Sequence, residues 1–475
     1  MAIIKKLTKI NIYIEWLIFM KILYCIRNNN IFNYQESFIE DLSQNGHTVH
    51  IVFSNIQKAK KEDFMDPNTF ERLEKLPNIS FENLISKRNI IQKTNMIFRE
   101  VKNYQRYFSK PYQDSPQHSF YQERWEKYLP IFIRFIFTKV SIFKSTSFIK
   151  FTNKFFNLVE FISGSPKSHK KIIDDFNPDA IIATPANLRY SEEVDFIKYG
   201  KKKGIFSVIS VLSWDNLTTK GGFNISPDKF IVWNSIHEKE LINYHDVDKK
   251  NILILGSTFF DKWFMEKYDG FKKQDFNRIF NIKSEDKFII YLGSSSNLGK
   301  HDQNVISEIL KFLENSSMKD LIVILKPHLT NKNYLNKFEN VDNVRVWRND
   351  LTIDWVENQA MFKFGLNNAI CSLGLNTTAM IDSVINHCPV ISIIYEGNID
   401  QPTNSAIHFK NIMDSNIFYV INGTNNLDQY INSAAKDRSS FEEKRNKFIS
   451  NFIRPIDPKL NVGEIARKEI EKLLG

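Results

Sequence analysis

Chemically useful side chains in this 475-residue sequence are concentrated in short loops that follow apolar runs. The densest loop, residues 213–221, contains an aromatic ring, a carboxylate, an amide, hydroxyls and an amine, and it directly follows the predicted strand 206–211. Asp215 is the expected general base, because a carboxylate in a mostly closed cleft can have its pKa raised toward the working pH. The alternative is that Asp215 only caps a turn.

A second group of polar residues lies where a helix is predicted to begin, after the predicted strand 369–371. Asn376, Thr377 and Thr378 bring free backbone N–H groups, hydroxyls and the positive end of the helix dipole to one point. Such a point favours an anion, most naturally a diphosphate. Asp382 lies one turn further along the same face, where its carboxylate could bind a ribose hydroxyl pair. The alternative is that Thr377 merely caps the helix.

Two more loops follow the first strands of the second half of the chain. Ser294 and Ser295 come directly after the predicted strand 288–292, in a loop that matches neither a dinucleotide-binding nor a Walker motif. Their small side chains and N–H groups suit phosphate oxygens, although a plain turn is an equal alternative. Lys326 and His328 follow the next predicted strand, and a cation beside an imidazole at a strand end suits a negatively charged group.

The remaining candidate contacts come from a late loop and from the first half of the chain. His408 follows a predicted buried strand and a polar stretch, so a phosphate or substrate contact is expected. The first predicted strand ends in polar residues that would face the same cleft. Together with the loop around Asp215, they give five expected acceptor contacts: Arg27, Asn28, Trp214, Asn216 and Lys220.

The elements that must position these loops alternate between strand and helix. Residues 21–26, a helical pattern and the apolar run 49–53 form a βαβ unit, which starts a parallel sheet. Residues 57–170 interrupt the alternation and are predicted to form long helices. Regular alternation resumes near residue 179, and a second series begins at residue 288.

The predicted fold class is therefore α/β, with two Rossmann-like domains that face each other across a cleft. A helical insertion interrupts the first domain, and a C-terminal helix crosses back to it. Open parallel sheets bind ligands at the carboxyl ends of their strands, which is where the candidate loops lie. The predicted boundaries are 1–258 for the N-terminal acceptor domain with its insertion at about 57–170, 259–285 for the linker, 286–435 for the donor domain and 436–475 for the returning helices.

The composition limits the protein class without naming a partner. Lysine and arginine number 64 against 54 acidic residues, which gives a net charge of +10 and permits an anionic partner. Three cysteines without CxxC spacing exclude a disulfide framework and a thiolate zinc site. No segment is apolar enough to span a membrane, residues 10–26 being the nearest candidate. The expected location is the cytoplasm, at the inner face of the cell membrane.

One stretch, residues 127–162, suggests a surface for an anionic membrane. Residues 127–159 contain no acidic residue. A basic amphipathic helix with aromatic anchors binds an anionic bilayer, but a core helix with a solvated basic edge is an open alternative. Nucleic acid is a poorer explanation, because no recognised motif accompanies the basic residues. The apolar residues at helical spacing are Phe148, Phe151, Phe155, Leu158 and Ile162.

Taken together, these motifs resemble those of GT-B glycosyltransferases. More narrowly, the chain resembles bacterial surface or capsular polysaccharide transferases and the related CDP-glycerol glycerophosphotransferases. The resemblance extends over most of the chain except about 57–170. The segments that carry it are residues 46–49, 213–221, 227–234, Gly256 with Phe260 and Asp261, 326–328, 376–382, 389–390, 408–409 and 452–455.

The resemblance implies a nucleotide-activated sugar in the C-terminal domain and a glycan or lipid-linked acceptor on the N-terminal one. In that picture Asp215 deprotonates the acceptor hydroxyl, Asp382 holds the ribose and Trp347 stacks near the base. No metal and no cofactor is implied, because no DxD-type cluster stands at a strand end. The residues expected around the donor phosphates are Ser294, Ser295, Lys326, His328, Asn376, Thr377, Thr378 and His408.

Several reactions remain open within this resemblance. Retaining members pair two glutamates eight positions apart, whereas Gly374 lies eight residues before Asp382, so inversion is favoured. The related UDP-GlcNAc 2-epimerases carry Ser-Gly-Gly at the helix start, where this chain has residues 376–378 as Asn-Thr-Thr, which counts against epimerisation. Transfer of a polyol phosphate from a CDP-activated donor is an alternative. From another class, the chain could be a non-catalytic scaffold of a glycan-assembly complex.

Overall fold

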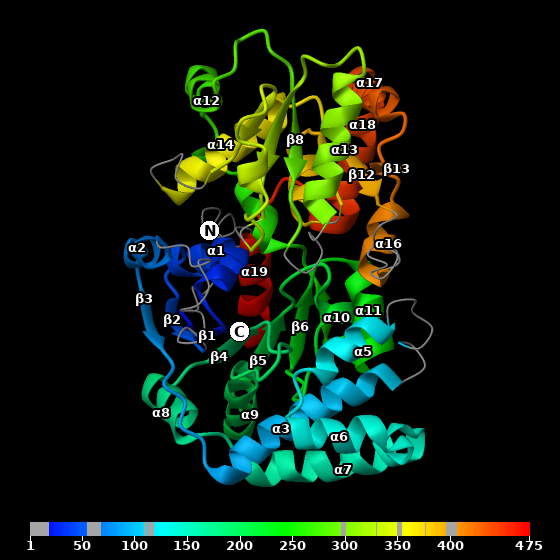
Figure 1. Cartoon of the computed structure of the whole chain (residues 1–475). Helices are drawn as coiled ribbons and strands as arrows, with labels where there is room; N and C mark the ends of the chain where they lie inside the picture. The colour runs from blue at the N-terminus through cyan, green and yellow to red at the C-terminus, as the bar shows by residue number, and fades with distance from the viewer. Residues whose placement is uncertain are drawn as a thin grey trace, which may run out of the picture.

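The computed structural model contains two lobes, one above the other in Figure 1, each built on a parallel sheet. It describes residues 19–54, 68–108, 112, 118–295, 301–328, 330–348, 354–375, 377–395 and 406–475. The chain passes from the lower lobe to the upper one once and returns through its C-terminal helix (Figure 1). This is the predicted fold class: two α/β domains with a crossover helix.

The first lobe contains a seven-stranded sheet in the order β3-β2-β1-β4-β5-β6-β7, and every pairing in it is parallel. Alternate side chains of β1 enter different apolar clusters, so both faces of the sheet are buried. The strands are β1 (Lys21–Ile26), β2 (Thr48–Phe53), β3 (Ile79–Asn83), β4 (Ala180–Thr184), β5 (Phe206–Ser210), β6 (Lys229–Val232) and β7 (Ile252–Ile254).

The helices of the first lobe cover this sheet and form the insertion. The prediction that residues 57–170 contain only helices is wrong at β3, which pairs with β2 at the sheet edge through the register Val49 to Ile79. The α-helices are α1 (Asn29–Gln44), α2 (Thr69–Glu74), α3 (Ile90–Gln105), α5 (His118–Glu126), α6 (Ile131–Lys139), α7 (Thr146–Ser163), α8 (Lys167–Phe176), α9 (Glu193–Lys203), α10 (Asn216–Thr219) and α11 (Ser235–His245). Short 3₁₀ turns are η3 (Arg106–Phe108), η4 (Ser141–Lys144) and η5 (Lys249–Asn251).

The second lobe contains a six-stranded parallel sheet in the order β10-β9-β8-β11-β12-β13. The strand predicted at 369–371 is observed three residues later, as β11. The helix before it, α14, continues to Asn368, immediately before the predicted strand. The strands are β8 (Phe288–Leu292), β9 (Ile322–Lys326), β10 (Val344–Val346), β11 (Ser372–Gly374), β12 (Val390–Ile394) and β13 (Phe418–Asn422).

The predicted linker is an ordered, packed segment rather than a plain connection. Phe276 and Phe280 of α12 pack on Trp347 inside the second lobe. The linker elements are η6 (Thr258–Phe264), η7 (Glu266–Tyr268) and α12 (Lys273–Phe280). The other helices of this half are α13 (Asp302–Glu314), η9 (Leu335–Lys337), α14 (Trp355–Asn368), α15 (Ala379–Ile385), α16 (Ile407–Met413), α17 (Leu427–Lys436), α18 (Arg438–Phe448), the π-helix η12 (Ile449–Ile453) and α19 (Val462–Leu474).

A buried ion-pair network attaches the insertion to the first lobe. Arg99 of α3 binds Glu160 of α7 at 2.7 Å and Asp195 of α9 at 2.9 Å. Lys198 of α9 also binds Glu160 at 2.7 Å. Burial disfavours the ionised form of Asp195, but Arg99 and Arg88 outweigh it and hold the pKa of this carboxyl below its usual range.

The outer face of the insertion is apolar and exposed. In α7 the side chains of Phe151, Phe155, Leu158 and Ile162 are 49–68% exposed, whereas Phe156 on the opposite face is buried. Helices α6 and α7 lie at the end of the lower lobe that is remote from the upper lobe (Figure 1). The alternative that the predicted stripe packs into the core is therefore wrong for these four residues. Among the described residues, no helix is both long and apolar enough to cross a bilayer.

The C-terminal helix returns to the first lobe and is fixed there by the linker. Asp261 in η6 is fully buried and accepts hydrogen bonds from Ser37 of α1, from Arg454 and from the backbone N–H groups of Val462 and Gly463. One carboxylate thus joins three segments that are distant in sequence. Residues 436–475 were expected to cross back to the N-terminal domain, and this contact anchors them there.

Replacement of Asp261 tests the anchor. We expect Asp261→Asn to lower the free energy of unfolding by about 3–5 kcal/mol, because it leaves the Arg454 guanidinium buried without a counter-charge. Urea unfolding followed by circular dichroism measures the change. The matched control is Asp275→Asn, which removes an exposed carboxylate paired with Arg278 and is expected to cost about 1 kcal/mol or less. Equal losses in the two variants would contradict the anchoring role.

Candidate active site

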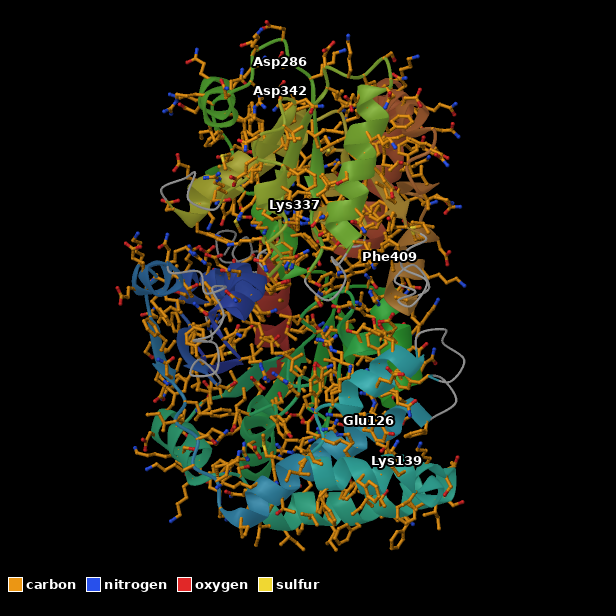
Figure 2. The ribbon with its side chains drawn as sticks, in the orientation of Figure 1. Glu126, Lys139, Asp286, Lys337, Asp342 and Phe409 are labelled. Atoms are coloured by element: carbon orange, nitrogen blue, oxygen red, sulfur yellow. The ribbon has the colours of Figure 1, made fainter. Side chains whose placement is uncertain are left out.

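A cavity of about 370 Å³ lies between the two lobes. Nine of the residues selected from the sequence line it: Trp214, Asp215, Ser295, Lys326, His328, Thr377, Thr378, Asp382 and His408. In Figure 2 the labelled Phe409, next to His408, lies at the level where the lobes meet, whereas Asp286 and Asp342 mark the far end of the upper lobe. The cavity therefore brings together the ends of strands from both sheets, as the loop positions predicted.

Direct contacts between the lobes close one side of this cavity. The indole N–H of Trp214 donates to the Thr378 hydroxyl oxygen at 3.1 Å. The Trp214 ring also meets the edge of His408, with ring centres 4.8 Å apart. Behind this pair, Asn411 of α16 donates to Glu240 of α11 at 3.2 Å. The loop after β5 is thus held against the beginning of α15 in the other lobe.

Thr377 and Thr378 stand at the start of α15 with their side chains toward the cavity. The N-cap position is Thr378 rather than Thr377, and the Thr378 side chain makes no hydrogen bond that caps the helix. The predicted contact at Asn376 falls outside the described residues. The start of α15 therefore offers hydroxyl groups to a ligand, in agreement with the anion site expected there.

Two lysines lie close enough to Asp382, which lines the cavity, to influence its pKa. Burial, together with the positive charge of Lys262, lowers the pKa of Lys326 to about 8, although Asp382 acts in the opposite direction. The Lys326 ammonium lies 4.5 Å from the centre of the Phe362 ring. Lys262, in the predicted linker, was not selected from the sequence because a lysine in a charged segment without a clear period gives no signal of burial. Lys326 lines the cavity and can pair with an anion there.

Asp382 is held by the linker. The indole N–H of Trp263 donates to one of its carboxylate oxygens at 2.7 Å. Burial raises the pKa of Asp382 even though Lys262, Trp263 and Lys326 act against that rise. One carboxylate oxygen is therefore committed, and the other remains for the ribose contact expected from the sequence.

Asp215 forms a compact polar cluster with its own loop. Its Oδ2 accepts from Lys220 and from Thr219, both at 2.9 Å, and its Oδ1 accepts from the Ser213 hydroxyl. Burial would raise its pKa, but Lys220, His408 and the hydrogen bond from Ser213 outweigh burial and hold the pKa well below its usual range. The expectation of a raised pKa is thus wrong, because Lys220, five residues further on, folds back and pairs with the carboxylate.

The two histidines of the cavity are neutral at physiological pH. Burial lowers the pKa of His408 to about 4 although Asp215 acts against that change. Burial and the neighbouring Lys326 lower the pKa of His328 to about 4. Within the described part of the chain, Nδ1 of His408 has no hydrogen-bond partner. Both rings can therefore donate one hydrogen bond to a ligand without adding a charge.

The loop after β8 is organised by a residue that the sequence did not single out. Asp302, at the start of α13, accepts from the backbone N–H of Ser294 and from the Tyr291 hydroxyl, both at 2.9 Å. Burial raises its pKa to about 6. Ser294 is itself fully buried and lies behind the cavity wall, whereas Ser295 faces the cavity. The predicted phosphate contact of the Ser294 side chain is therefore wrong, whereas the contact predicted for Ser295 stays a prediction.

Trp347 does not face the cavity. The ring is 1% exposed and packs against Phe280 and Phe362 in the core of the second lobe. Its predicted role as a stacking surface for the base is contradicted by this burial. Tyr34 of α1, which lines the cavity and stacks on Phe259 at 4.1 Å, is an aromatic surface that the sequence did not reveal.

Three of the expected acceptor contacts are set back from the cavity. Asn28 caps α1 by accepting from the backbone N–H of Ile31 at 3.2 Å, so its side chain has a structural role. Asn216 is fully buried, and within the described residues its side-chain oxygen and nitrogen have no partner. Arg27 donates to the backbone oxygen of Arg189 at 3.0 Å. Trp214 lines the cavity, and Lys220 binds Asp215, which also lines it.

One group of side chains in the described part of the chain has metal-ligand spacing, and it lies in the first lobe rather than in the cavity. The ligand atoms of His169, Glu192 and Asp195 lie within 4.8 Å of one another. Arg88 forms ion pairs with both carboxylates. These carboxylates are therefore already neutralised within the network that attaches the insertion.

No protein family model matches the sequence, and no curated protein matches it. Solved structures of similar shape do exist. The UDP-GlcNAc 2-epimerase of Neisseria meningitidis bound to UDP-GlcNAc superimposes with a TM-score of 0.56 at 10% identity, over 95% of this chain and 100% of that one. The UDP-GlcNAc 2-epimerase of Methanocaldococcus jannaschii gives 0.52 at 14% identity, over 95% and 100%. A glycosyltransferase of Rickettsia africae gives 0.51 at 12% identity, over 96% and 98%.

At these identities the likeness concerns the fold. The chain has the two-domain GT-B fold, which nucleotide-sugar epimerases and glycosyltransferases share. The fold alone does not decide what this protein does, so its function must be argued from the site.

The lowered pKa of Lys326 gives a pH test of the anion site. Below about pH 8 this amine is protonated, and above that pH it loses its charge. We expect the affinity for inorganic pyrophosphate to fall about tenfold between pH 7 and 9.5 in the wild type, because a charge-assisted hydrogen bond is lost. Lys326→Arg should remove most of this decline, since arginine stays protonated. Isothermal titration calorimetry measures both proteins, and the ionisation of the probe itself cancels in their ratio.

The control for this titration is Lys337→Arg, which changes an exposed lysine of the same lobe (Figure 2). It should retain the wild-type decline. A parallel decline in the wild type and in Lys326→Arg would show that another group controls binding.

Proposed function

We propose that this protein is a glycosyltransferase that moves a sugar from a nucleotide-activated donor to a hydroxyl of a cell-surface glycan or lipid-linked acceptor. The observation that carries the proposal is a single inter-lobe cavity with two different ends. One end has the Lys326 cation, hydroxyls and a helix start from the second lobe, and the other has the Asp215 carboxylate from the first lobe. A diphosphate leaving group and an acceptor hydroxyl require these two environments on opposite sides of one reacting carbon.

The donor end suits the departure of a diphosphate. Negative charge develops on the leaving oxygen as the sugar bond breaks, and groups already fixed around that oxygen stabilise the charge without reorganisation. Lys326, the Thr378 hydroxyl and the neutral ring of His328 are such groups. The proposed reaction is inverting and needs neither a metal nor another cofactor for this step, because cations and hydrogen-bond donors of the chain meet the charge.

The acceptor end assigns Asp215 as the general base. Its low pKa keeps the carboxylate ionised across the physiological range. A strongly stabilised carboxylate is a weak base, but a bound donor brings negative charge next to it. Like charges disfavour ionisation, so donor binding raises the pKa of Asp215 and increases its basicity when the acceptor hydroxyl arrives. Lys220, bound at 2.9 Å, keeps the carboxylate oriented.

Replacement of Asp215 tests the proposed base. We expect Asp215→Asn to lower turnover by a factor of about 10²–10⁴, since general-base catalysis is worth about that much. Donor binding, measured by the shift of the melting temperature, should change little. Asp286→Asn, at the far end of the second lobe (Figure 2), is the matched control and should keep full turnover. Unchanged turnover in Asp215→Asn would remove Asp215 from the mechanism.

A panel of UDP-, GDP-, CMP- and CDP-linked donors separates the remaining functions. A ligand that binds only the folded state raises the melting temperature, by an amount that corresponds to about 2.7 kcal/mol at 100 times its Kd. Donor binding followed by acceptor-dependent release of the nucleotide supports transfer, and a CDP-polyol that is consumed identifies polyol-phosphate transfer. Conversion of the donor without an acceptor would indicate an epimerase. Stabilisation by none of them would indicate a scaffold.

We also propose that the exposed apolar face of α6 and α7 binds the anionic inner face of the cell membrane. Phe132, Phe135, Phe151 and Phe155 are 49–71% exposed, which is unusual for phenylalanine in a protein that stays in water. The same segment has exposed lysines, and residues 127–159 have no carboxylate to repel acidic lipids. Phenylalanines that enter the lipid beside lysines that meet headgroups would bring the enzyme to a lipid-linked acceptor.

Vesicle sedimentation tests the membrane face. We expect binding to vesicles to rise with their content of phosphatidylglycerol and to fall with salt, because each basic residue near the surface contributes about 1 kcal/mol. Phe151→Ser with Phe155→Ser should reduce the bound fraction several-fold at every lipid composition. Phe19→Ser, which changes another exposed phenylalanine of the first lobe, is the control. Binding that changes neither with lipid charge nor with salt concentration would contradict a membrane role for this face.

A further inference from the structure

Three arginines of the first lobe are connected to one another beside the proposed acceptor end. Arg27 follows β1 and donates to the backbone oxygen of Arg189 at 3.0 Å. The exposed guanidinium of Arg189, in the loop after β4, lies 4.8 Å from the centre of the Tyr128 ring. Arg124 of α5 donates to the Tyr128 hydroxyl at 3.1 Å. Residues from two strand ends and from the insertion thus form one continuous cationic surface.

These three arginines have no carboxylate as an ion-pair partner among the described residues, unlike several other arginines of the chain. Among the described residues, none of the three lies within ion-pair distance of a carboxylate, and Nη1 of Arg27 is buried without a hydrogen-bond partner. Glu100 is near enough for Arg27 to influence it, but burial raises its pKa to about 7, so it is only partly ionised at neutral pH. By contrast, a carboxylate is bound by each of Arg72, Arg88, Arg99, Arg454 and Arg467.

The strand order places this surface close to Asp215. Strands β1, β4 and β5 are neighbours in the sheet, and Arg27, Arg189 and Asp215 follow their carboxyl ends in that order. The loops that carry them therefore leave neighbouring positions on one edge of the sheet. Arg124 is near enough for Asp215 to contribute to the rise of its pKa.

We propose that Arg27, Arg124 and Arg189 bind a phosphate group of the acceptor on the same sheet edge as Asp215, which activates the acceptor hydroxyl. The inference rests on the proposed function, because it names the chemical class of the acceptor. Guanidinium groups suit phosphate oxygens, since their planar donors bind two oxygens at once. Nη1 of Arg27 is buried without a hydrogen-bond partner among the described residues, and a phosphate oxygen would supply both that partner and a counter-charge. Lys220 completes the positive edge of the surface beside Asp215.

Two kinds of acceptor contain a phosphate of this chemistry. It belongs either to a diphosphate that links the acceptor to a lipid or to phosphodiesters within a growing polymer. Geranyl diphosphate serves as a probe of the first source, and a trimer of glycerol phosphate serves as a probe of the second. Geraniol and glycerol are their uncharged counterparts.

Calorimetric titration of these four probes into the full-length protein at pH 7 and 0.15 M salt tests the proposal. At least one phosphate probe should bind while its uncharged counterpart does not. The double variant Arg27→Gln with Arg189→Gln should weaken that binding at least tenfold, because two charge-assisted contacts are lost. The charge-matched control is Arg278→Gln with Arg348→Gln, which removes two exposed arginines of the second lobe and should leave the affinity within twofold. Lys326→Gln, at the donor end, should also leave it within twofold.

The outcomes are decisive in each direction. Weakened binding of either probe in the double variant alone supports the proposal and identifies the source. Binding of neither probe, or equal affinity in the double variant and its control, overturns it, as does loss of binding in Lys326→Gln alone. If the double variant does not fold, Arg124→Gln replaces it, since this side chain makes one hydrogen bond within the described residues. Donor-induced stabilisation and the turnover of Asp215→Asn do not depend on these arginines, so failure here leaves the proposed function to its own test.

Discussion

The buried carboxylate of Asp261 is the constraint on which the arrangement of the lobes depends. It binds α1, Arg454 and the first residues of α19, so the linker, the first helix and the last helix share one acceptor group. A charge buried so deeply is stable only when all of its oxygen lone pairs are satisfied, and these three segments satisfy them only in one relative position. The same η6 turn carries Lys262 and Trp263 to Asp382, which lines the cavity. Fixing the crossover therefore also fixes part of the site.

Burial explains the ionisation of the whole cavity. It lowers the pKa of Lys326 to about 8 and the pKa values of His328 and His408 to about 4, while specific partners keep Asp215 ionised. By itself the site thus has neutral imidazoles, a lysine with a lowered pKa and a weakly basic carboxylate. A bound diphosphate changes each of these in the direction that the proposed transfer needs, because it favours a protonated lysine and a more basic carboxylate. In this view the donor prepares the site for the acceptor.

The insertion connects the proposed chemistry with a surface. Its inner side is attached to the first lobe by the ion pairs of Arg99, and its outer side presents the phenylalanines of α6 and α7. Arg124 on α5, in the same insertion, joins the arginines at the acceptor end. One structural unit would therefore both approach a bilayer and contact the acceptor.

The sequence by itself determined the two parallel sheets and the loops that meet between them. Residues 288–292 and 390–394 are continuous apolar runs, the pattern of strands covered on both faces, and the structure has strands at those bounds. Because parallel strands end at one edge of a sheet, loop position alone brought nine selected residues to one cavity. Only the tertiary structure decided the burial of Trp347, the contact of Trp263 with Asp382, the role of Lys262 and the direction of the Asp215 pKa shift. Local pattern records which face of an element is apolar, whereas burial and charge depend on neighbours brought together from distant parts of the chain.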